Sequence, residues 1–354
     1  MIYTILIFIA VLLVVVIVHE FGHYIAAKKS GMLVEEFGFG IPPRLFAVRK
    51  GETVYSFNAL PMGGFVKIAG ENEGVENIPE SRQFEYAKWY KKVLVLVAGV
   101  CGNLLLGFTL FFFALMVGLP SASTTGQSTV LSVSPGSPAA HADVRVGDIV
   151  AGFGVGGKNQ VQVIDTEHIH TFLQTQKGAV SITLERNGEL VQKTIQPSVA
   201  TDGSVKIGLA VEDVSRASYG WKESLSMAYH KTIEVIGMLF GVIGNLVGGL
   251  IHHKDSGASD LVGPVGIASE LGGARAFGFG YILYFAGLIS LNLAVLNILP
   301  FPALDGGRLF VVLIETIIGR KLPKRLIQIV HTAGFILLLG LILVLTFKDI
   351  AKLV

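Results

Sequence analysis

The stretch Val14–Gly31, VVVIVHEFGHYIAAKKSG, joins a run of β-branched apolar residues directly to two histidines and a glutamate. His19 and His23 are four residues apart, so a helix would present both imidazoles on one face, one turn apart. This spacing is typical of two zinc ligands, and Glu20 beside them is placed to accept a proton from water that the metal activates. The alternative is a polar cap on a membrane helix. Ionisable residues at membrane depth are costly and usually functional, which favours catalysis.

The composition indicates a membrane protein that also carries a soluble part. Of 354 residues, 51% are hydrophobic and 15% are charged, whereas soluble domains have about 25% charged residues. The net charge of +2 and the lack of a Lys/Arg-rich block argue against a nucleic-acid partner. Cys101 is the single cysteine, so the chain can form neither an intramolecular disulfide nor an all-cysteine metal site.

Four apolar segments are long enough to cross a hydrocarbon core of ~30 Å; they lie at about 2–26, 93–119, 281–299 and 327–347. The first segment lacks a basic leader and a cleavage site, so we expect an uncleaved helix rather than a signal peptide. Basic residues flank the first-to-second and third-to-fourth connections, which predicts that both connections are cytoplasmic and both termini are outside.

The segment 232–251 is also apolar, but it contains Glu234, Asn245 and four glycines. If it crossed the membrane, the later basic connection would be moved to the outside, against the charge bias. We therefore expect four spans, with 232–251 lying on the outer surface or packed against the bundle.

A soluble, β-rich region lies between the second and third spans. Residues 129–197 alternate apolar and polar positions, and Val180, Ile182 and Leu184 fall on one face of a predicted strand. Asn187-Gly188 fits a two-residue hairpin turn after that strand. The region therefore predicts a compact β domain of about 70–80 residues.

A third metal ligand has to come from elsewhere, because a catalytic zinc usually has three protein ligands. Asp305 follows the third span, among two prolines and two glycines that a regular helix cannot accommodate. Broken backbone at membrane depth occurs where it lines a cavity or is buried in protein. His19 lies roughly 26 Å along its helix, near the cytoplasmic side, and a four-span topology brings Asp305 to the same side. The alternative role for Asp305 is that of a turn residue before glycine.

Four features together resemble the site-2 protease family, specifically the bacterial RseP-type intramembrane metalloproteases. They are HEFGH at 19–23, GVCGN at 99–103, a PDZ-like insert that opens with VLSVSPGSPAAHADVRVGD, and NILPFPALDG at 297–306. GFGIPPRLF and ALPMGGFVKIAGE resemble the membrane-associated β-hairpin of the family, and GPVGIA resembles its signature after the PDZ domain. Val100 stands where many members have proline, and one PDZ-like domain fits here where some relatives have two. A generic β-sandwich is the alternative for the insert.

The resemblance implies one Zn²⁺ per chain, held by His19, His23 and Asp305, with Glu20 as the catalytic residue. It also implies that Asn297 and Asn103 contact the substrate, although Asn103 has helix–helix packing as an equal alternative. Gly63 and Gly64 in the hairpin would allow close approach of a substrate strand that pairs with its edge. His252, His253 and His331 have no partner at ligand spacing and are expected to be solvated or interfacial.

We therefore expect a membrane α-helical bundle of four transmembrane helices with an inserted PDZ-like domain. Residues 1–120 would hold the first two helices and a cytoplasmic-side hairpin at about 37–72. Residues 128–213 would form the extracytoplasmic PDZ-like domain, 217–278 a membrane-surface segment, and 279–354 the last two helices with the LDG motif. The expected location is the bacterial inner membrane, with the active site toward the cytoplasm.

The predicted function is regulated intramembrane proteolysis of single-span membrane proteins, such as a pre-cleaved anti-sigma factor or remnant signal peptides. The partners would be the lipid bilayer and an upstream site-1 protease that removes the outer domain of the same substrate. A PDZ-bearing scaffold with a non-catalytic zinc site is the first alternative, but His19, Glu20, His23 and Asp305 are all present. A metal permease is the second alternative, and it would have ionisable residues in several spans.

Overall fold

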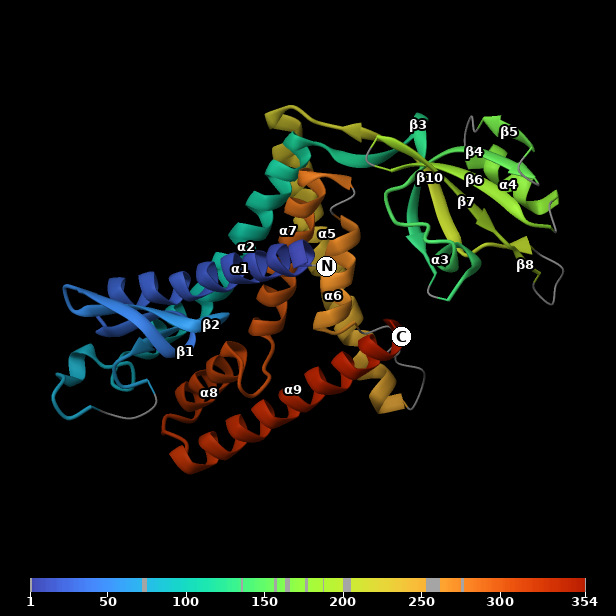
Figure 1. Ribbon diagram of the computed structural model, residues 1–354. Coiled ribbons are helices and arrows are strands. Elements are labelled where there is room, and N and C mark those ends of the chain that lie inside the picture. Colours follow the sequence, from blue (N-terminus) through green and yellow to red (C-terminus); the bar gives the residue numbers. More distant parts are fainter. Residues whose placement is uncertain are drawn as a thin grey trace. The chain divides into compact units, whose positions relative to one another are not determined.

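The computed structural model describes residues 2–71, 75–134, 136–155, 158–162, 166–175, 178–186, 188–199, 205–252, 262–274 and 277–353. The chain divides into two compact units. The first unit consists mainly of long helices and a β-hairpin, and the second is built around an antiparallel sheet (Figure 1). The first comprises residues 1–113, 222–268 and 283–349, and the second comprises 114–221, 269–282 and 350–354.

The described residues include five helices that are long and apolar enough to cross a membrane. They are α1 (Ile2–Lys29), α2 (Trp89–Val117), α5 (Trp221–His252), α7 (Phe279–Ile298) and α9 (Lys324–Leu353). In lipid every backbone N–H and C=O group must bond within the chain, so valine-rich segments such as Val14–Val18 become helical despite their modest helix preference. The predicted surface segment 232–251 lies inside α5, so the expected number of four spans is not confirmed.

The β-hairpin of the first unit folds back on itself. Strand β1 (Val34–Lys50) and strand β2 (Thr53–Ile68) pair near their tip, where Lys50 lies opposite Thr53. The start of β1 pairs with two different parts of β2, one on each side. Phe37, for example, lies opposite Tyr55 on one side and opposite Val66 on the other. The result is a four-segment sheet whose order is 64–68, 34–39, 53–58 and 44–50. Residues 64–68 and 44–50 form its two edges.

The hairpin turns its corner at Gly40 and Asn58. Gly40 has φ +77°, and a Cβ atom there would lie 2.6 Å from the carbonyl oxygen of Leu60. The buried side-chain amide of Asn58 donates to the carbonyl oxygens of Phe39 and Gly40, each at 3.1 Å. These contacts fix the bend that brings the second half of β2 back beside β1, and β2 packs against α1.

The second unit contains a six-stranded antiparallel sheet with the order β10-β3-β4-β6-β7, in which β5 pairs with β4. The pairing of β3 and β10 continues beyond the sheet as a two-stranded ribbon, where Leu119 lies opposite Ala217. The strands are β3 (Leu119–Val133), β4 (Ile149–Val155), β5 (Lys158–Gln162), β6 (Val180–Arg186), β7 (Glu189–Ile195) and β10 (Leu209–Ala217).

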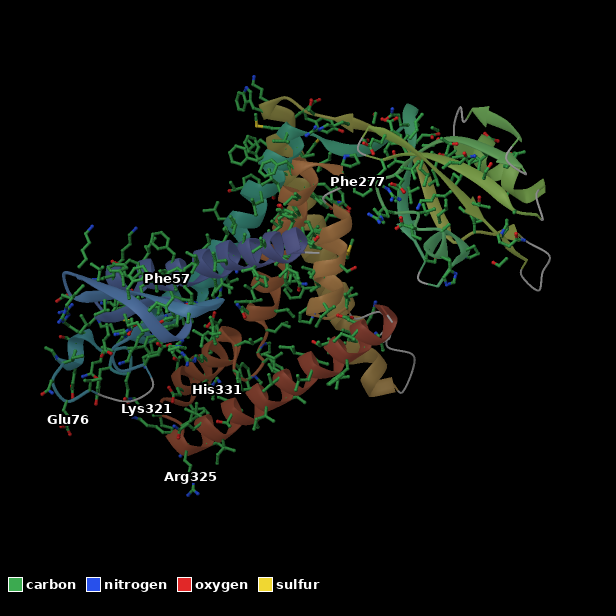
Figure 2. The ribbon with its side chains drawn as sticks, in the orientation of Figure 1. Phe57, Glu76, Phe277, Lys321, Arg325 and His331 are labelled. Carbon is green, nitrogen blue, oxygen red and sulfur yellow. The ribbon has the colours of Figure 1, made fainter. Side chains whose placement is uncertain are left out.

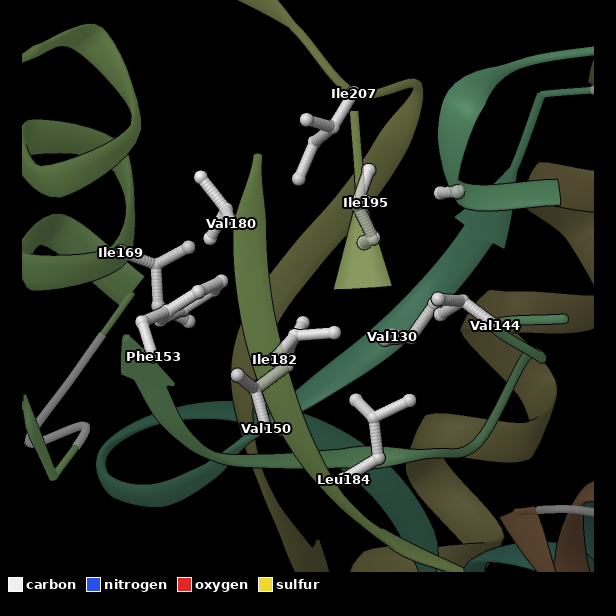
Figure 3. Packing of buried hydrophobic residues seen from close by; sticks show 11 residues of the cluster. Val130, Val144, Val150, Phe153, Ile169, Val180, Ile182, Leu184, Ile195 and Ile207 are labelled. Atoms are coloured by element: carbon white, nitrogen blue, oxygen red, sulfur yellow. The ribbon is translucent and has the colours of Figure 1, made fainter. Parts of the chain in front are cut away.

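One apolar core lies inside this unit, as Figure 3 shows. Val180, Ile182 and Leu184 are all buried in it, which confirms the predicted inward face of β6. Helix α4 (Thr166–Thr175) contributes Ile169 to the same core. Asn187 of the predicted hairpin turn lies outside the described residues, and β6 pairs with β7 in regular antiparallel register.

Helix α3 (Pro138–His141) is a short helix within the stretch VLSVSPGSPAAHADVRVGD and begins directly after Ser137. The Ser137 hydroxyl accepts a hydrogen bond from the Ala140 N–H group, and Pro138 occupies the first turn, where its missing N–H group is not needed. The PDZ character of this unit stays a prediction, because strands and a short capped helix of this kind occur in other β domains as well.

Charged side chains of the second unit form a connected network of ion pairs. The Arg186 guanidinium donates twice to the buried carboxylate of Asp148, at 2.7 Å each, and also contacts Asp143. Hydrogen bonds from Arg145 and from Lys193 hold the pKa of Asp143 well below its usual range. The Asp148 carboxylate, which is 2% exposed, is therefore neutralised by a single guanidinium.

The remaining elements are short or connect the long helices. Helix α6 (Pro264–Ala274) is held at its N-terminus by Asp349 of α9, whose carboxylate accepts from the Gly263 and Gly266 N–H groups at 3.3 and 2.8 Å. GPVGIA, predicted as a family signature, therefore forms a capped helix start. The short and connecting elements of the fold are η1 (Glu80–Arg82), β8 (Ser198–Val199), β9 (Val205–Lys206), α6 (Pro264–Ala274) and α8 (Asp305–Ile318).

Candidate active site

Helix α1 presents the two histidines of HEFGH on one face, as their spacing predicted. The Nε2 atoms of His19 and His23 are 3.2 Å apart, and the two rings meet edge to face with centroids 4.7 Å apart. Both residues are buried, with exposed fractions of 6% and 8%. The polar pair therefore lies within the protein, where its nitrogen atoms need partners.

Asp305 reaches this pair from the other end of the chain. Its Oδ2 atom lies 2.9 Å from Nε2 of His19 and 3.1 Å from Nε2 of His23. Helix α7 ends at Ile298, and the proline-containing loop that follows returns the chain so that α8 begins at Asp305. The broken backbone expected after the third predicted span is therefore present, and it brings the carboxylate to the histidines.

The two glycines after Asp305 make this return possible. A Cβ atom on Gly306 would lie 2.0 Å from the carbonyl oxygen of Leu299, and one on Gly307 would lie 2.3 Å from that of Phe301. Backbone atoms cannot retreat as a flexible side chain can, so these positions admit no side chain. The LDGG sequence is thus explained by the close return of α8 onto its own loop.

The three donor atoms fit a zinc ion. Two imidazole nitrogens and one carboxylate oxygen, separated by 2.9 to 3.2 Å, can all be reached by one ion with bonds of about 2.0–2.2 Å. Gly99 of α2 leaves the space open: a Cβ atom there would lie 2.4 Å from His23 Nε2 and 2.8 Å from His19 Cε1. Two histidines and one carboxylate also form a common ligand set of catalytic zinc.

Helix α2 supports His23 from behind. The Nδ1 atom of His23 lies 2.8 Å from the Val95 carbonyl oxygen, so the ring donates through Nδ1 and keeps the lone pair of Nε2 for a metal. The two helices approach closely here, because a Cβ atom on Gly22 would lie 2.3 Å from the Ala98 carbonyl oxygen. These glycines allow the backbone of α2 to contact the ligand helix directly.

The two asparagines predicted to contact the substrate both lie beside His19. Nδ2 of Asn297, at the end of α7, is 3.3 Å from His19 Nε2, on the side of the donor cluster. Nδ2 of Asn103 is 3.4 Å from Nδ1, at the back of the same ring. Asn297 is thus beside the candidate reaction centre, whereas Asn103 lies behind the imidazole.

Glu20 lies beside the cluster and lines a cavity of about 940 Å³ together with His23 and Asp305. The edge segment of β2 forms another wall through Phe65, Val66, Lys67 and Ile68. Gly64 also approaches Glu20, since a Cβ atom there would lie 3.3 Å from its Cγ atom. Gly63 has open space around its Cα atom, so a side chain would fit there. Its φ of +105° is nevertheless a backbone conformation that glycine adopts more readily than other residues.

One contact that supports the loop before Asp305 was not predicted from the sequence. His331 of α9, labelled in Figure 2, accepts a hydrogen bond at Nδ1 from the Ala303 N–H group, at 3.0 Å. Ala303 has φ +77°, and a Cβ atom on Gly334, one turn along α9, would lie 2.4 Å from Pro302. The prediction of a solvated or interfacial His331 was therefore incomplete, because the residue supports the loop before Asp305. His252 has no described side chain, and His253 lies outside the described residues.

Comparison with known families agrees with this geometry. Residues 7–341 match the sequence model of Peptidase family M50. The chain belongs to this family. The resemblance to site-2 proteases is therefore confirmed, as is the prediction of a membrane zinc metallopeptidase.

Several known proteins match almost the full chain. A protein of Clostridium perfringens named "putative zinc metalloprotease" is 34% identical over 342 residues, which cover 95% of each chain. The zinc metalloprotease RasP of Geobacillus kaustophilus is 27% identical over 425 residues, covering 98% of this chain and 97% of RasP. A protein of Arabidopsis thaliana named "probable membrane metalloprotease ARASP2, chloroplastic" is 30% identical over 352 residues, which cover 96% of this chain and 78% of the Arabidopsis protein.

Proposed function

We propose that this M50 peptidase is an intramembrane zinc endopeptidase that cleaves single-span membrane proteins. The observation that carries the proposal is the meeting of three donor residues at helices long enough to cross a membrane. His19 and His23 lie on such a helix, α1, and Asp305 begins α8 after the loop that ends another, α7. A soluble peptidase has no reason to build its metal ligands into such helices, because polar residues at membrane depth are costly. A substrate that is itself a membrane helix would require that placement.

Each residue of the cluster has a proposed role. His19, His23 and Asp305 would hold the zinc, which would supply a Lewis acid for the peptide carbonyl and lower the pKa of water, so that water can lose a proton and attack the carbonyl carbon. Glu20 would take the proton from water and give it to the leaving amine. The Asn297 amide would donate a hydrogen bond to the substrate carbonyl oxygen as negative charge develops on it.

The exposed edge of the hairpin supports a way of holding the substrate. A helical peptide has its carbonyl groups occupied by its own N–H groups, so it must unwind before cleavage. The 64–68 edge of β2 lines the cavity beside Glu20 and Asp305. An unwound segment could add to this edge as a further strand, with main-chain hydrogen bonds supplying affinity. Gly64 would let it approach Glu20 closely.

The β-rich second unit is proposed to be a PDZ-like domain on the extracytoplasmic side, where it would exclude substrates with bulky outer domains. The order of events would then be removal of that outer domain by a site-1 protease, followed by cleavage here. The proposed location is the bacterial inner membrane, with the site facing the cytoplasm and both termini outside, as the basic flanks of the predicted spans indicate.

Deletion of residues 129–197 separates two roles for this domain. Under size exclusion, the deleted enzyme should cleave untrimmed substrates and still cleave trimmed ones. Under peptide capture, it should cleave trimmed substrates more slowly. A deletion variant that inserts, binds zinc and treats both substrates as the wild type does would contradict both roles.

Substrate cleavage is best tested by comparing wild type with Glu20→Gln, each co-expressed with tagged single-span membrane proteins. The proposal expects a substrate fragment only with the wild-type enzyme, at equal protein levels and equal zinc content. Identical fragments from both would show that the cleavage comes from another protease, and would favour the scaffold alternative.

A further inference from the structure

Helix α2 faces the two histidines with three residues at regular spacing. Val95, Gly99 and Asn103 are four residues apart, so they lie on one face of α2. The Val95 carbonyl contacts His23, Gly99 leaves space for both rings, and the Asn103 side chain contacts His19. The HEFGH helix therefore meets a complementary surface in which each imidazole has its own partner behind it.

The groups of α2 that contact the two histidines differ in their hydrogen-bonding capacity. The Nδ1 atom of His23 faces a carbonyl oxygen, which can only accept a hydrogen bond, so the protonated nitrogen of this ring is fixed. The Nδ1 atom of His19 faces a side-chain amide, which can present either its oxygen or its nitrogen. Which atom faces the ring decides whether Nδ1 or Nε2 of His19 carries the hydrogen.

The burial of Asn103 makes this choice important. The residue is 0% exposed, and its Oδ1 atom has no hydrogen-bond partner among the residues that the structure describes. The oxygen and nitrogen of an amide are assigned from their hydrogen bonds rather than distinguished directly. If the amide is rotated by 180°, the oxygen gains the Nδ1–H group of His19 as its partner, and Nδ2 takes the position that has no partner among the described residues. The lone pair of Nε2 then points away from Asn103, toward the donor cluster.

Asn103 is also anchored from a third helix. The Ser290 hydroxyl of α7 donates to the main-chain carbonyl oxygen of Asn103 at 2.8 Å, and both residues are fully buried. This contact fixes the backbone of α2 without using the side-chain amide. The main chain of Asn103 is therefore held by Ser290, and its side-chain amide is available to contact His19.

We infer that Asn103 is a positioning residue for the zinc site, whose side-chain oxygen accepts from Nδ1–H of His19 and fixes the ring with Nε2 directed at the metal. It does for His19 what the Val95 carbonyl does for His23. Outer partners of this kind typically change metal affinity by about 10- to 100-fold when they are removed. This role replaces direct substrate contact by Asn103, and it rests on the proposed zinc ligands.

The test compares zinc affinity in three variants of the full-length protein, measured in detergent by competition with a chelator. Asn103→Leu has a similar size but no acceptor, and it should bind zinc about 10- to 100-fold more weakly. Asn103→Asp keeps an acceptor and has no donor, so its affinity should stay within about threefold of wild type or increase. Ser290→Ala removes the backbone anchor but leaves the amide, and serves as the matched control with wild-type affinity.

Several results would overturn the inference. They are wild-type zinc affinity in Asn103→Leu, a tenfold loss in Asn103→Asp, or equal losses in Asn103→Leu and Ser290→Ala, which would indicate packing alone. If Asn103→Leu does not accumulate, a tenfold loss in Asn103→Asp would still overturn the inference, and Asn103→Ala takes the place of Asn103→Leu as the variant without an acceptor. Replacing His19 by alanine distinguishes the two levels of the account. Loss of zinc there with wild-type affinity in Asn103→Leu contradicts this inference alone, whereas full zinc in His19→Ala contradicts the proposed ligand set.

Discussion

Gly99→Ala places a methyl group in the space between α2 and the two imidazoles. The new Cβ atom would lie 2.4 Å from Nε2 and 2.7 Å from Cε1 of His23, and 2.8 Å from Cε1 of His19. An ordinary contact of this kind is about 3.5 Å, so the rings and the methyl group must separate by about 1 Å. His23 cannot retreat without breaking its hydrogen bond to the Val95 carbonyl oxygen, at 2.8 Å.

The expected cost appears mainly in metal binding. Overpacking of a well-packed interior costs about 1–3 kcal/mol, and here the movement falls on ligand atoms. We expect zinc affinity to fall about 10- to 100-fold, comparable with the loss of an outer partner, and cleavage to fall with it. Isothermal titration of the metal-free protein with zinc measures this directly.

The control is Gly237→Ala in α5, where a Cβ atom meets nothing within 4 Å. Alanine is favoured over glycine within a helix, so this variant should bind zinc as the wild type does. If Gly99→Ala also binds zinc and cleaves substrate within about twofold of wild type, the ligand atoms do not occupy the space that the structure gives them, and the reasoning is refuted.

Other predictions concern the hairpin and the second unit. Val66→Pro removes a main-chain donor from the hairpin edge, so kcat/KM for a helical substrate should fall about 2- to 10-fold with normal zinc content; unchanged cleavage would argue against strand addition. Arg186→Ala leaves the buried Asp148 carboxylate unpaired, and native-state hydrogen exchange of β6 in the full-length protein should show a loss of about 3–5 kcal/mol; wild-type protection would contradict the pairing. Arg145 and other cations lower the pKa of Asp143, so its stabilising contribution is present above the unfolded pKa of about 3.9 and is lost as the pH falls below it. Protection of β6 that is constant between pH 5 and pH 2 would contradict this.

The local patterns of the chain predicted which side chains share a helix face and where the helix backbone breaks. The four-residue spacing of His19 and His23 fixes their shared face in any helix, and the prolines near Asp305 predict a broken backbone whatever surrounds it. Alternation in β6 likewise predicted its buried face. These features depend on residues close together in the sequence, so composition and spacing are sufficient to find them.

Contacts between distant segments were not predictable in the same way. Nothing in the sequence around Gly99 shows that it faces two imidazoles, and nothing around His331 shows that it binds the Ala303 N–H group. The double pairing of the first part of β1 depends on a corner that only the folded hairpin reveals. The charge bias favoured four spans, but α5 is as long as the other four candidate helices and, although the least apolar of them, is still apolar enough to cross, so hydropathy alone could not decide its place.

The most direct test of the account is the amount of zinc bound per chain in Asp305→Ala and Glu20→Gln, purified in parallel with wild type and measured by elemental mass spectrometry. If Asp305 is a ligand and Glu20 transfers protons, Asp305→Ala should lose most of its zinc, while Glu20→Gln should keep about one ion per chain. Full zinc occupancy in Asp305→Ala would contradict the central claim that His19, His23 and Asp305 form the metal site.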